Sequence, residues 1–252
     1  LGERNINNHW YYFDEKTGVM QVGLVSHHGN KYYYNSEGQM QYGEQIIGGN
    51  KYYFDKARGV MQTGLVSYGG NLYYYNADGQ MQYGEQTVDG VLYYFNPSNG
   101  AMRLGWYEKD GNKYYCTAEG MALGERNINN HWYYFDEKTG AMQTGLVSHH
   151  EKGYYYNAEG QMQYGEQQIN GDWYYFDPVS GVMAIGWTEH HGNTYCYDSK
   201  GVMHHGWAEV EGVTYYFDEI RGFLHPNWRK IDGKTYYYDN GEKYFGEKYI
   251  DG

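Results

Sequence analysis

A glycine recurs along the whole chain at intervals of 19 to 21 residues, and this period constrains the fold more than any other feature. Each glycine closes a phrase of aromatic residues, a polar turn and a methionine, such as WYYFDEKTGVMQVG at residues 10–23. Self-similarity at a fixed period of this length is typical of repeat architectures. Asn227 replaces the glycine once, and the period predicts twelve complete repeats and the start of a thirteenth. These slot glycines are Gly2, Gly23, Gly43, Gly64, Gly84, Gly105, Gly124, Gly145, Gly165, Gly186, Gly206 and Gly246.

The repeats alternate, so the working unit is a pair of repeats of about 41 residues. The residue after the slot glycine is Glu3, Glu44 and Glu85 in the first, third and fifth repeats, and leucine in the second and fourth. The fourth residue of the aromatic run alternates between phenylalanine and tyrosine. Residues 1–45 also nearly match residues 123–167, at an offset of 122 residues. This longer copy indicates a duplication of six repeats.

Each repeat is expected to form one β-hairpin. A repeat of this length is too short for two helices, and its tyrosine and phenylalanine runs favour strands. Residues 51–55 predict one strand, Gly59 a turn, and residues 60–63 another strand. Because an isolated hairpin is marginally stable in water, the hairpins must stack on their neighbours. We therefore predict an all-β fold, a solenoid of stacked β-hairpins, forming a single repeat array over residues 1–252.

The composition narrows the class of protein. The chain has 19 basic and 31 acidic residues, a net charge of −12, so nucleic acid, which needs a basic footprint, is not an expected partner. A mean hydropathy of −0.89 without a long apolar run predicts no membrane insertion. Cys116 and Cys196 occupy aromatic positions and are expected to be buried fillers without a disulfide. Residue 1 falls inside the opening segment of a repeat, so we expect a fragment of a larger secreted protein.

Strand alternation places the first and third aromatic positions on one face and the second and fourth on the other. The first position varies most, and we expect it on the open face, where Trp10, Trp132 and Trp173 occupy it. Exposed tryptophan and tyrosine suit stacking on sugars or enclosing a quaternary ammonium group. All ten methionines fall in one position of the repeat, which predicts packing between hairpins, the floor of an aromatic pocket, or both.

The phrase resembles the cell-wall-binding repeat family of Gram-positive bacterial surface proteins. That family includes choline-binding modules of streptococcal and phage lysins, glucan-binding repeats of glucansucrases and receptor-binding repeats of large clostridial toxins. The resemblance spans the chain and rests on the pairs Gly105-Trp106, Gly186-Trp187 and Gly206-Trp207, the aromatic run, and the Gly-x-Met-x-x-Gly ending. It implies a β-hairpin solenoid, often superhelical, that anchors a secreted protein to a polysaccharide or wall polymer.

In the choline-binding branch, the resemblance implies ligand sites between consecutive hairpins, built from the opening tryptophan, the first aromatic position, an aromatic residue of the next hairpin and a nearby methionine. The opening tryptophans here are Trp106, Trp187, Trp207 and Trp228. Repeats whose first aromatic position is tryptophan carry glutamate after the slot glycine instead, so the tryptophan pair never occurs in one repeat. This favours a glycan over choline. The predicted ligand-binding residues are Trp173, Tyr175, Met183, Trp187, Met203, Trp207, Tyr216, Trp228, Tyr237, Trp106, Trp10 and Trp132.

The histidine pairs raise the question of a metal. Adjacent histidines on a strand point to opposite faces, so a pair is not expected to chelate, and we predict solvated loop residues and no metal site. The pairs are His27-His28, His149-His150, His190-His191 and His204-His205. Recurrent acidic residues such as Asp14, Asp55, Asp136, Asp177 and Asp218 start turns and are expected to cap them. We predict no catalytic site and no cofactor.

The predicted function is a non-catalytic, multivalent binding module that attaches a secreted or cell-surface protein to its ligand. The expected partner is a bacterial cell-wall polymer, a glucan or another oligosaccharide. Repetition converts weak individual contacts into firm attachment. The alternatives are a choline-binding module of a wall hydrolase, a receptor-oligosaccharide-binding repeat domain of a toxin or adhesin with a host glycan as partner, and a purely structural spacer.

Overall fold

The computed structural model describes residues 1–239, 242–243 and 245, and this part of the chain is all β. It contains 26 strands, paired as antiparallel hairpins, and no helix among the described residues. None of its elements is therefore a helix of the length and apolarity that crosses a bilayer. The predicted all-β fold of repeated hairpins is confirmed. The slot glycine Gly246 and the start of the thirteenth repeat lie outside the described residues.

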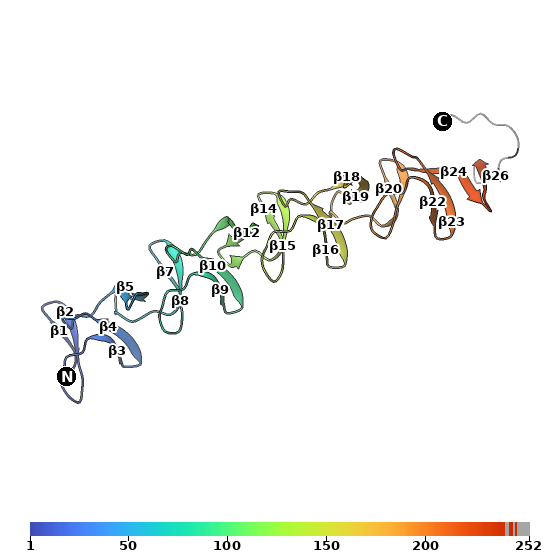
Figure 1. Cartoon of the computed structure of the whole chain (residues 1–252). Coiled ribbons are helices and arrows are strands. Elements are labelled where there is room, and N and C mark those ends of the chain that lie inside the picture. Colours follow the sequence, from blue (N-terminus) through green and yellow to red (C-terminus); the bar gives the residue numbers. More distant parts are fainter. Residues whose placement is uncertain (240–241, 244, 246–252) are drawn as a thin grey trace. The chain divides into compact units, whose positions relative to one another are not determined.

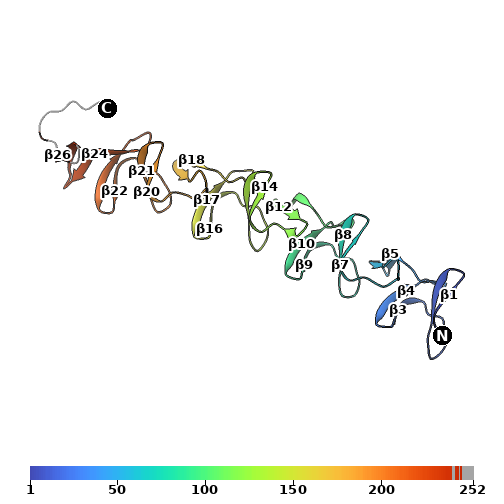
Figure 2. The same ribbon diagram turned by 180° about the vertical axis from the view of Figure 1, so that it is seen from behind.

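The chain divides into two compact units, residues 1–123 with 138–141, and residues 124–137 with 142–252. The second unit begins at Gly124, one residue after the start of the longer sequence copy. In the first unit, consecutive hairpins follow one another in chain order (Figures 1 and 2). Its strands are β1 (Gly2–Ile6), β2 (His9–Phe13), β3 (Gly23–His27), β4 (Asn30–Tyr34), β5 (Gly43–Ile47), β6 (Asn50–Phe54), β7 (Gly64–Tyr68), β8 (Asn71–Tyr75), β9 (Gly84–Val88), β10 (Val91–Phe95), β11 (Gly105–Lys109), β12 (Asn112–Thr117) and β13 (Gly120–Met121).

The second unit repeats this arrangement. Most of its sheets are two-stranded hairpins, and the last is a five-stranded sheet in the order β22-β23-β24-β25-β26. Its strands are β14 (Gly124–Ile128), β15 (His131–Phe135), β16 (Gly145–His149), β17 (Lys152–Tyr156), β18 (Gly165–Ile169), β19 (Asp172–Phe176), β20 (Gly186–His190), β21 (Asn193–Tyr197), β22 (Gly206–Val210), β23 (Val213–Phe217), β24 (Leu224–Ile231), β25 (Lys234–Asp239) and β26 (Glu242–Lys243).

In the described residues, the two strands that open each repeat are closed by a two-residue turn. In the β18–β19 hairpin the register runs from Gly165 opposite Phe176 to Ile169 opposite Asp172. The turn residues, Asn170 and Gly171, both have positive φ. This is the type I′ geometry, whose twist matches that of the paired strands and which favours asparagine, aspartate and glycine.

A methionine joins most hairpins to the preceding one. After β21 the chain turns back, and Met203 forms a bridge with Tyr197 of its own hairpin. The Met203 backbone N–H also donates to the Trp173 carbonyl of the preceding hairpin, at 2.8 Å. The same hydrogen bond, between residues 30 positions apart, occurs in other repeats, for example from the Met61 backbone N–H to the Lys31 carbonyl. The fixed methionine position is therefore set by backbone geometry as well as by packing.

Two glycines of each repeat are required for different reasons. Gly181, in the turn after β19, has φ +71°, and a Cβ there would lie 2.5 Å from the Met162 sulfur of the preceding repeat. The slot glycine Gly186 has a similar φ of +74°, but open space surrounds it. Glycine is therefore required at the slot only for its left-handed backbone conformation. At the turn position, glycine is also required because a side chain would collide with the methionine of the preceding repeat. Asn227 takes the slot position inside β24, where the pairing of β24 with β23 shifts register between Tyr215 and Tyr216.

The fourth aromatic position forms the centre of each repeat. Phe54, Phe176 and most of their equivalents are fully buried, and the first position is half-buried or exposed, as the strand alternation predicts. Tyrosine replaces phenylalanine where the end of the first strand carries a polar ring. His149 Nε2 lies 3.0 Å from the Tyr156 hydroxyl, for example, whereas Ile169 stands at that strand position beside Phe176. Cys116 and Cys196 are buried and free, as predicted.

Candidate functional site

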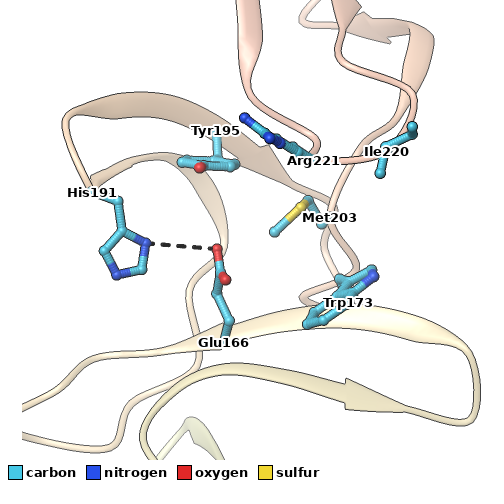
Figure 3. A pocket seen from close by; sticks show the side chains of 7 residues that line it. All are labelled: Glu166, Trp173, His191, Tyr195, Met203, Ile220 and Arg221. Carbon is cyan, nitrogen blue, oxygen red and sulfur yellow. Dashed lines mark ion pairs between the residues drawn. The ribbon is translucent and has the colours of Figure 1, made fainter.

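A groove lined by side chains of three consecutive repeats lies beside Trp173 (Figure 3). Its volume is about 270 Å³. β18 supplies the carboxylate, β19 the indole and β21 a tyrosine ring, while the segment after β21 supplies a methionine and the turn after β23 supplies the far rim. The lining residues are Glu166, Trp173, His191, Tyr195, Met203, Ile220 and Arg221.

Local strand geometry places the carboxylate next to the indole. Glu166 lies opposite Tyr175, and Gln168 lies opposite Trp173, so the glutamate and the tryptophan share one face of the hairpin. The hydrogen bond from the Met203 backbone to the Trp173 carbonyl then brings the methionine of the next repeat against that face. Figure 3 shows the Glu166 carboxylate, the Met203 thioether and the Trp173 indole facing the same space. We call this arrangement a Trp–Met–Glu groove.

A second Trp–Met–Glu groove occurs 41 residues earlier in the same unit. It has a volume of about 210 Å³ and is lined by Glu125, Trp132, Met162, Tyr164, Val179 and Ser180. Four of its residues correspond one by one to Glu166, Trp173, Met203 and Ile220 of the first groove. The rim differs in charge, because Ser180 stands where the other groove has Arg221.

The first unit holds the same residues 122 positions before the Trp132 groove. Trp10 has 41% of its surface exposed, and its carbonyl accepts the Met40 backbone N–H at 2.8 Å. Glu3 stands in β1, opposite Tyr12. Glu3, Trp10 and Met40 therefore take the positions that Glu125, Trp132 and Met162 take in the second unit.

In the third hairpin the protein fills the equivalent space with a cation of its own. Lys51 takes the first aromatic position, and its ammonium lies 3.2 Å from the carboxylate of Glu44. Met81 donates to the Lys51 carbonyl at 2.8 Å, as Met203 does to Trp173. The pair is only partly buried, so it contributes little to stability. It nevertheless identifies the space in front of this glutamate as one that accepts a positive charge.

A further cavity lies beside Leu72, in the first unit. Its volume is about 540 Å³. Leu72 holds the first aromatic position of its repeat, and Met102 and Leu104 complete an apolar wall. The residue after the slot glycine here is Leu65. This cavity therefore differs in chemistry from the Trp–Met–Glu grooves.

The opening tryptophans form a separate set of exposed or half-buried rings, each packed on a tyrosine. Trp187 packs against Tyr215 at a centroid distance of 5.0 Å, and Trp207 packs against Tyr216 at 4.9 Å. Trp106 with Tyr115 and Trp228 with Tyr237 form the same cross-strand contact as Trp207 with Tyr216, whereas Tyr215 belongs to the hairpin after that of Trp187. Trp187 and Trp207 have about two fifths of their surface exposed, at 39% and 40%.

The predicted binding residues are thus distributed over several places. Trp173, Tyr175 and Met203 pack around one core cluster, and Trp10 and Trp132 belong to the other two Trp–Met–Glu grooves. Met183 lies against Gly153 and Gly201. Sequence reasoning did not include the three glutamates, Tyr195 or Met162. The alternation of glutamate with leucine after the slot glycine is the signal that could have identified the glutamates.

The prediction that the histidines are solvated loop residues is wrong for the first member of three pairs. His27, His149 and His190 are buried, each with 7% of its surface exposed. His190 is stacked between Tyr175 and Tyr195, at 4.0 and 3.9 Å, and its Nε2 lies 2.8 Å from the Tyr197 hydroxyl. The second members, His28, His150 and His191, are exposed in the hairpin turns, as predicted.

The recurrent aspartates close turns, as predicted. The Asp177 carboxylate accepts the Ser180 backbone N–H at 2.7 Å and the Ser180 hydroxyl at 2.8 Å. Asp14 accepts the Thr17 backbone N–H and hydroxyl in the same way, at 2.8 Å each. These hydrogen bonds stabilise the ionised form and lower the pKa of both carboxyl groups.

The repeat pattern of two related families matches most of the chain. The choline-binding repeat matches residues 21–64, 62–104 and 143–186, and the putative cell wall binding repeat matches residues 4–20 and 126–142. Each Trp–Met–Glu groove includes residues from these matched ranges. The chain therefore belongs to the choline-binding repeat family, whose domains are binding modules. No curated protein matches the chain.

Solved structures with the same fold come from Streptococcus pneumoniae. CbpJ is 26% identical, with a TM-score of 0.61, over 88% of this chain and 94% of CbpJ. Choline binding protein F, solved in the presence of a peptidoglycan analogue, is 25% identical, with a TM-score of 0.54, over 96% of this chain and 92% of that protein. The choline-binding domain of CbpL is 27% identical, with a TM-score of 0.50, over 76% of this chain and 99% of that domain.

Proposed function

We propose that this chain is a non-catalytic, multivalent attachment module of a secreted or cell-surface protein, and that its Trp–Met–Glu grooves bind a choline-type quaternary ammonium group of a cell-wall polymer. The observation that carries the proposal is the Lys51 ammonium at 3.2 Å from the Glu44 carboxylate. Where tryptophan replaces that lysine, the same face offers an indole, a thioether and a carboxylate, and no lysine ammonium from that position occupies the space in front of the carboxylate. This reverses the preference for a glycan drawn from the missing tryptophan pairs.

The chemistry of the groove fits a bulky organic cation. A quaternary ammonium group lacks N–H donors, so it is held by aromatic faces and by long-range attraction to a negative charge. Trp173 supplies the aromatic face, Met203 a polarisable floor and Glu166 the charge. A cation–π contact at a partly exposed site contributes about 0.5–1 kcal/mol, so one groove binds weakly. Several grooves on one chain bind a polymer with many choline groups through avidity.

The test is retention of the full chain on immobilised choline, with elution by free choline. We expect Trp132→Ala and Glu125→Gln each to weaken retention, with the fold monitored by circular dichroism. Glu125→Gln keeps the side-chain shape and removes only the charge, so it separates binding from packing. Trp106→Ala is the matched control, because Trp106 lies outside the Trp–Met–Glu grooves. Undiminished retention in both groove variants would contradict the proposal.

A second candidate function is binding of a glycan, such as a glucan or the wall polysaccharide. It is favoured by the exposed rings of Trp106, Trp187 and Trp207, since flat aromatic faces stack on sugar rings. The measurement is retention on insoluble α-glucan and on Gram-positive cell walls, followed by elution with free sugar. We expect loss of that retention in Trp187→Ala while choline retention persists. Binding to a host glycan stays a prediction, which a mammalian glycan array would test.

A further inference from the structure

The turn after β20 brings two histidine rings to the same side of the hairpin. His190 is the last residue of the strand, and His191 is the first residue of the turn, with φ +50°. On a regular strand, neighbouring side chains point to opposite faces. The left-handed backbone at His191 breaks that alternation. The two Nδ1 atoms lie 3.3 Å apart, and the ring planes are 86° from parallel.

A carboxylate from the preceding hairpin points at both nitrogens. The Glu166 carboxylate oxygen lies 3.7 Å from His190 Nδ1 and 3.8 Å from His191 Nδ1. Figure 3 shows the contact with His191. Two nitrogen atoms bound to one tetrahedral zinc ion at the usual zinc–nitrogen bond length lie about 3.3 Å apart. The nitrogen spacing already matches that value, and the carboxylate would need to approach by only a few tenths of an ångström.

The buried ring is held in the orientation that a ligand needs. Its Nε2 lies 2.8 Å from the Tyr197 hydroxyl, so the Nδ1 atom is the one directed at Glu166 and His191. Stacking between Tyr175 and Tyr195 fixes the plane of the ring. Metal-binding histidines commonly use their second nitrogen in a hydrogen bond of this kind.

We propose that Glu166, His190 and His191 form a binding site for a divalent transition-metal ion of the zinc class. Two nitrogens and one carboxylate oxygen fit the ligand preferences of zinc, and they leave a fourth position open. The ion links the β18–β19 hairpin to the β20–β21 hairpin. Because Glu166 and His191 also line the Trp173 groove, the open position adjoins the space where the wall ligand is proposed to bind.

Two other histidine pairs provide natural comparisons within the chain. The Nδ1 atoms of His149 and His150 lie 3.2 Å apart, and those of His27 and His28 lie 3.3 Å apart. In both cases the preceding glutamate approaches the Nε2 atom of the buried ring instead, at 3.8 Å for Glu125. The three ligand atoms therefore converge at His190-His191, whereas at the other two pairs the contact of the carboxylate is with Nε2 and not with Nδ1.

The test is a Zn²⁺ titration of the full 252-residue chain by calorimetry, with a competing chelator to obtain the affinity. We expect His191→Asn and Glu166→Gln to weaken the strongest site by at least about tenfold. Asparagine tolerates the left-handed backbone of the turn, so His191→Asn leaves the hairpin intact. His150→Asn is the matched control and should leave that site unchanged. Zinc should also raise the unfolding temperature of the wild type, but not that of His191→Asn.

Tyr197 acts as a positioning residue, and its test needs a readout of the metal itself. Tyr197→Phe should fold, because phenylalanine occupies the same position in Phe176 and Phe217. We expect about tenfold weaker zinc binding and an altered visible spectrum of bound Co²⁺, which reports the coordination geometry. Equal affinity in the wild type and His191→Asn, or equal weakening by His150→Asn, would overturn the site. Trp173→Ala removes the groove indole without removing a metal ligand, so the two proposals can fail separately.

Discussion

The Lys51 ammonium lies 3.2 Å from the Glu44 carboxylate, on the hairpin face that carries Trp173 beside Glu166 six repeats further along the chain. The lysine therefore marks a groove whose cation is built into the protein. It also suggests how a new binding site can be made.

Lys51→Trp should add one choline-binding groove. The substitution removes the internal cation and supplies an indole beside Glu44, while Met81 already bonds to the backbone of residue 51. We expect one additional choline per chain by equilibrium dialysis, and stronger retention on immobilised choline. Lys31→Trp is the control, because Leu24 stands after the slot glycine of that repeat. An equal gain from both variants would show that the carboxylate has no role.

Arg221 at the rim should weaken cation binding in the Trp173 groove relative to the Trp132 groove, whose rim carries Ser180. A partly exposed charge interaction is worth about 0.2–1 kcal/mol, so Arg221→Ser should tighten choline binding there by up to about fivefold. Ser180→Arg should have the opposite effect in the Trp132 groove. Calorimetry with choline measures both changes. A neutral sugar would be insensitive to them, so unchanged choline affinity would favour the glycan hypothesis.

Most of the fold could be predicted from the repeat period. The slot glycine, the aromatic run and the turn aspartates predict hairpins directly, because each depends on backbone geometry within about twenty residues. The contact between Gly181 and Met162 could not be predicted, since it joins different repeats and depends on how closely the hairpins stack. The alternation of phenylalanine and tyrosine was visible, but its cause, a hydrogen bond to a buried ring such as His149, required the structure.

The candidate site was predictable in part. Trp173 and Met203 were expected to lie together, and the backbone bond between them explains why they do. Trp187 and Trp207 were also predicted to bind ligand, but they pack on tyrosines and do not line the Trp173 groove. The argument against chelation assumed that adjacent histidines point to opposite faces, and this premise does not hold at His191, which has a left-handed backbone. Turn conformation at a non-glycine residue is difficult to predict from sequence.

Gly181→Ala should destabilise the protein more than Gly186→Ala. Both residues have a left-handed backbone, which costs a residue with a side chain about 1–2 kcal/mol. At Gly181 the new Cβ also meets the Met162 sulfur at 2.5 Å, which adds about 1–3 kcal/mol of overpacking. Urea unfolding measures the difference. Combining Gly181→Ala with Met162→Ala should remove the overpacking contribution to the loss of stability. Purely additive effects of the two substitutions would contradict the contact between Gly181 and Met162.

Tyr156→Phe should destabilise the second unit by about 1–2 kcal/mol, although phenylalanine fills the same position in the neighbouring repeat. The Tyr156 hydroxyl lies 3.0 Å from Nε2 of the buried His149, and its loss leaves that polar atom without this hydrogen bond. The measurement is urea unfolding of the single variant. The double variant Tyr156→Phe with His149→Ile restores the combination found at Phe176 and Ile169. It should be more stable than the sum of the two single changes predicts.

Cys116 should be inert to thiol reagents in the folded protein. Burial raises the pKa of its thiol to about 12, and only 3% of the residue is exposed. The reactive thiolate is therefore scarce at pH 8, and the reagent cannot reach it without local unfolding. We expect labelling of Cys116 and Cys196 by a chromogenic disulfide to be slow in buffer and rapid in denaturant. The labelling rate in buffer then measures the opening of the repeats that hold these residues. Gly181→Ala should raise the labelling rate at Cys196, which lies in the next repeat, more than at Cys116. Rapid labelling of the folded wild type would show that the sulfur is not enclosed between stacked hairpins.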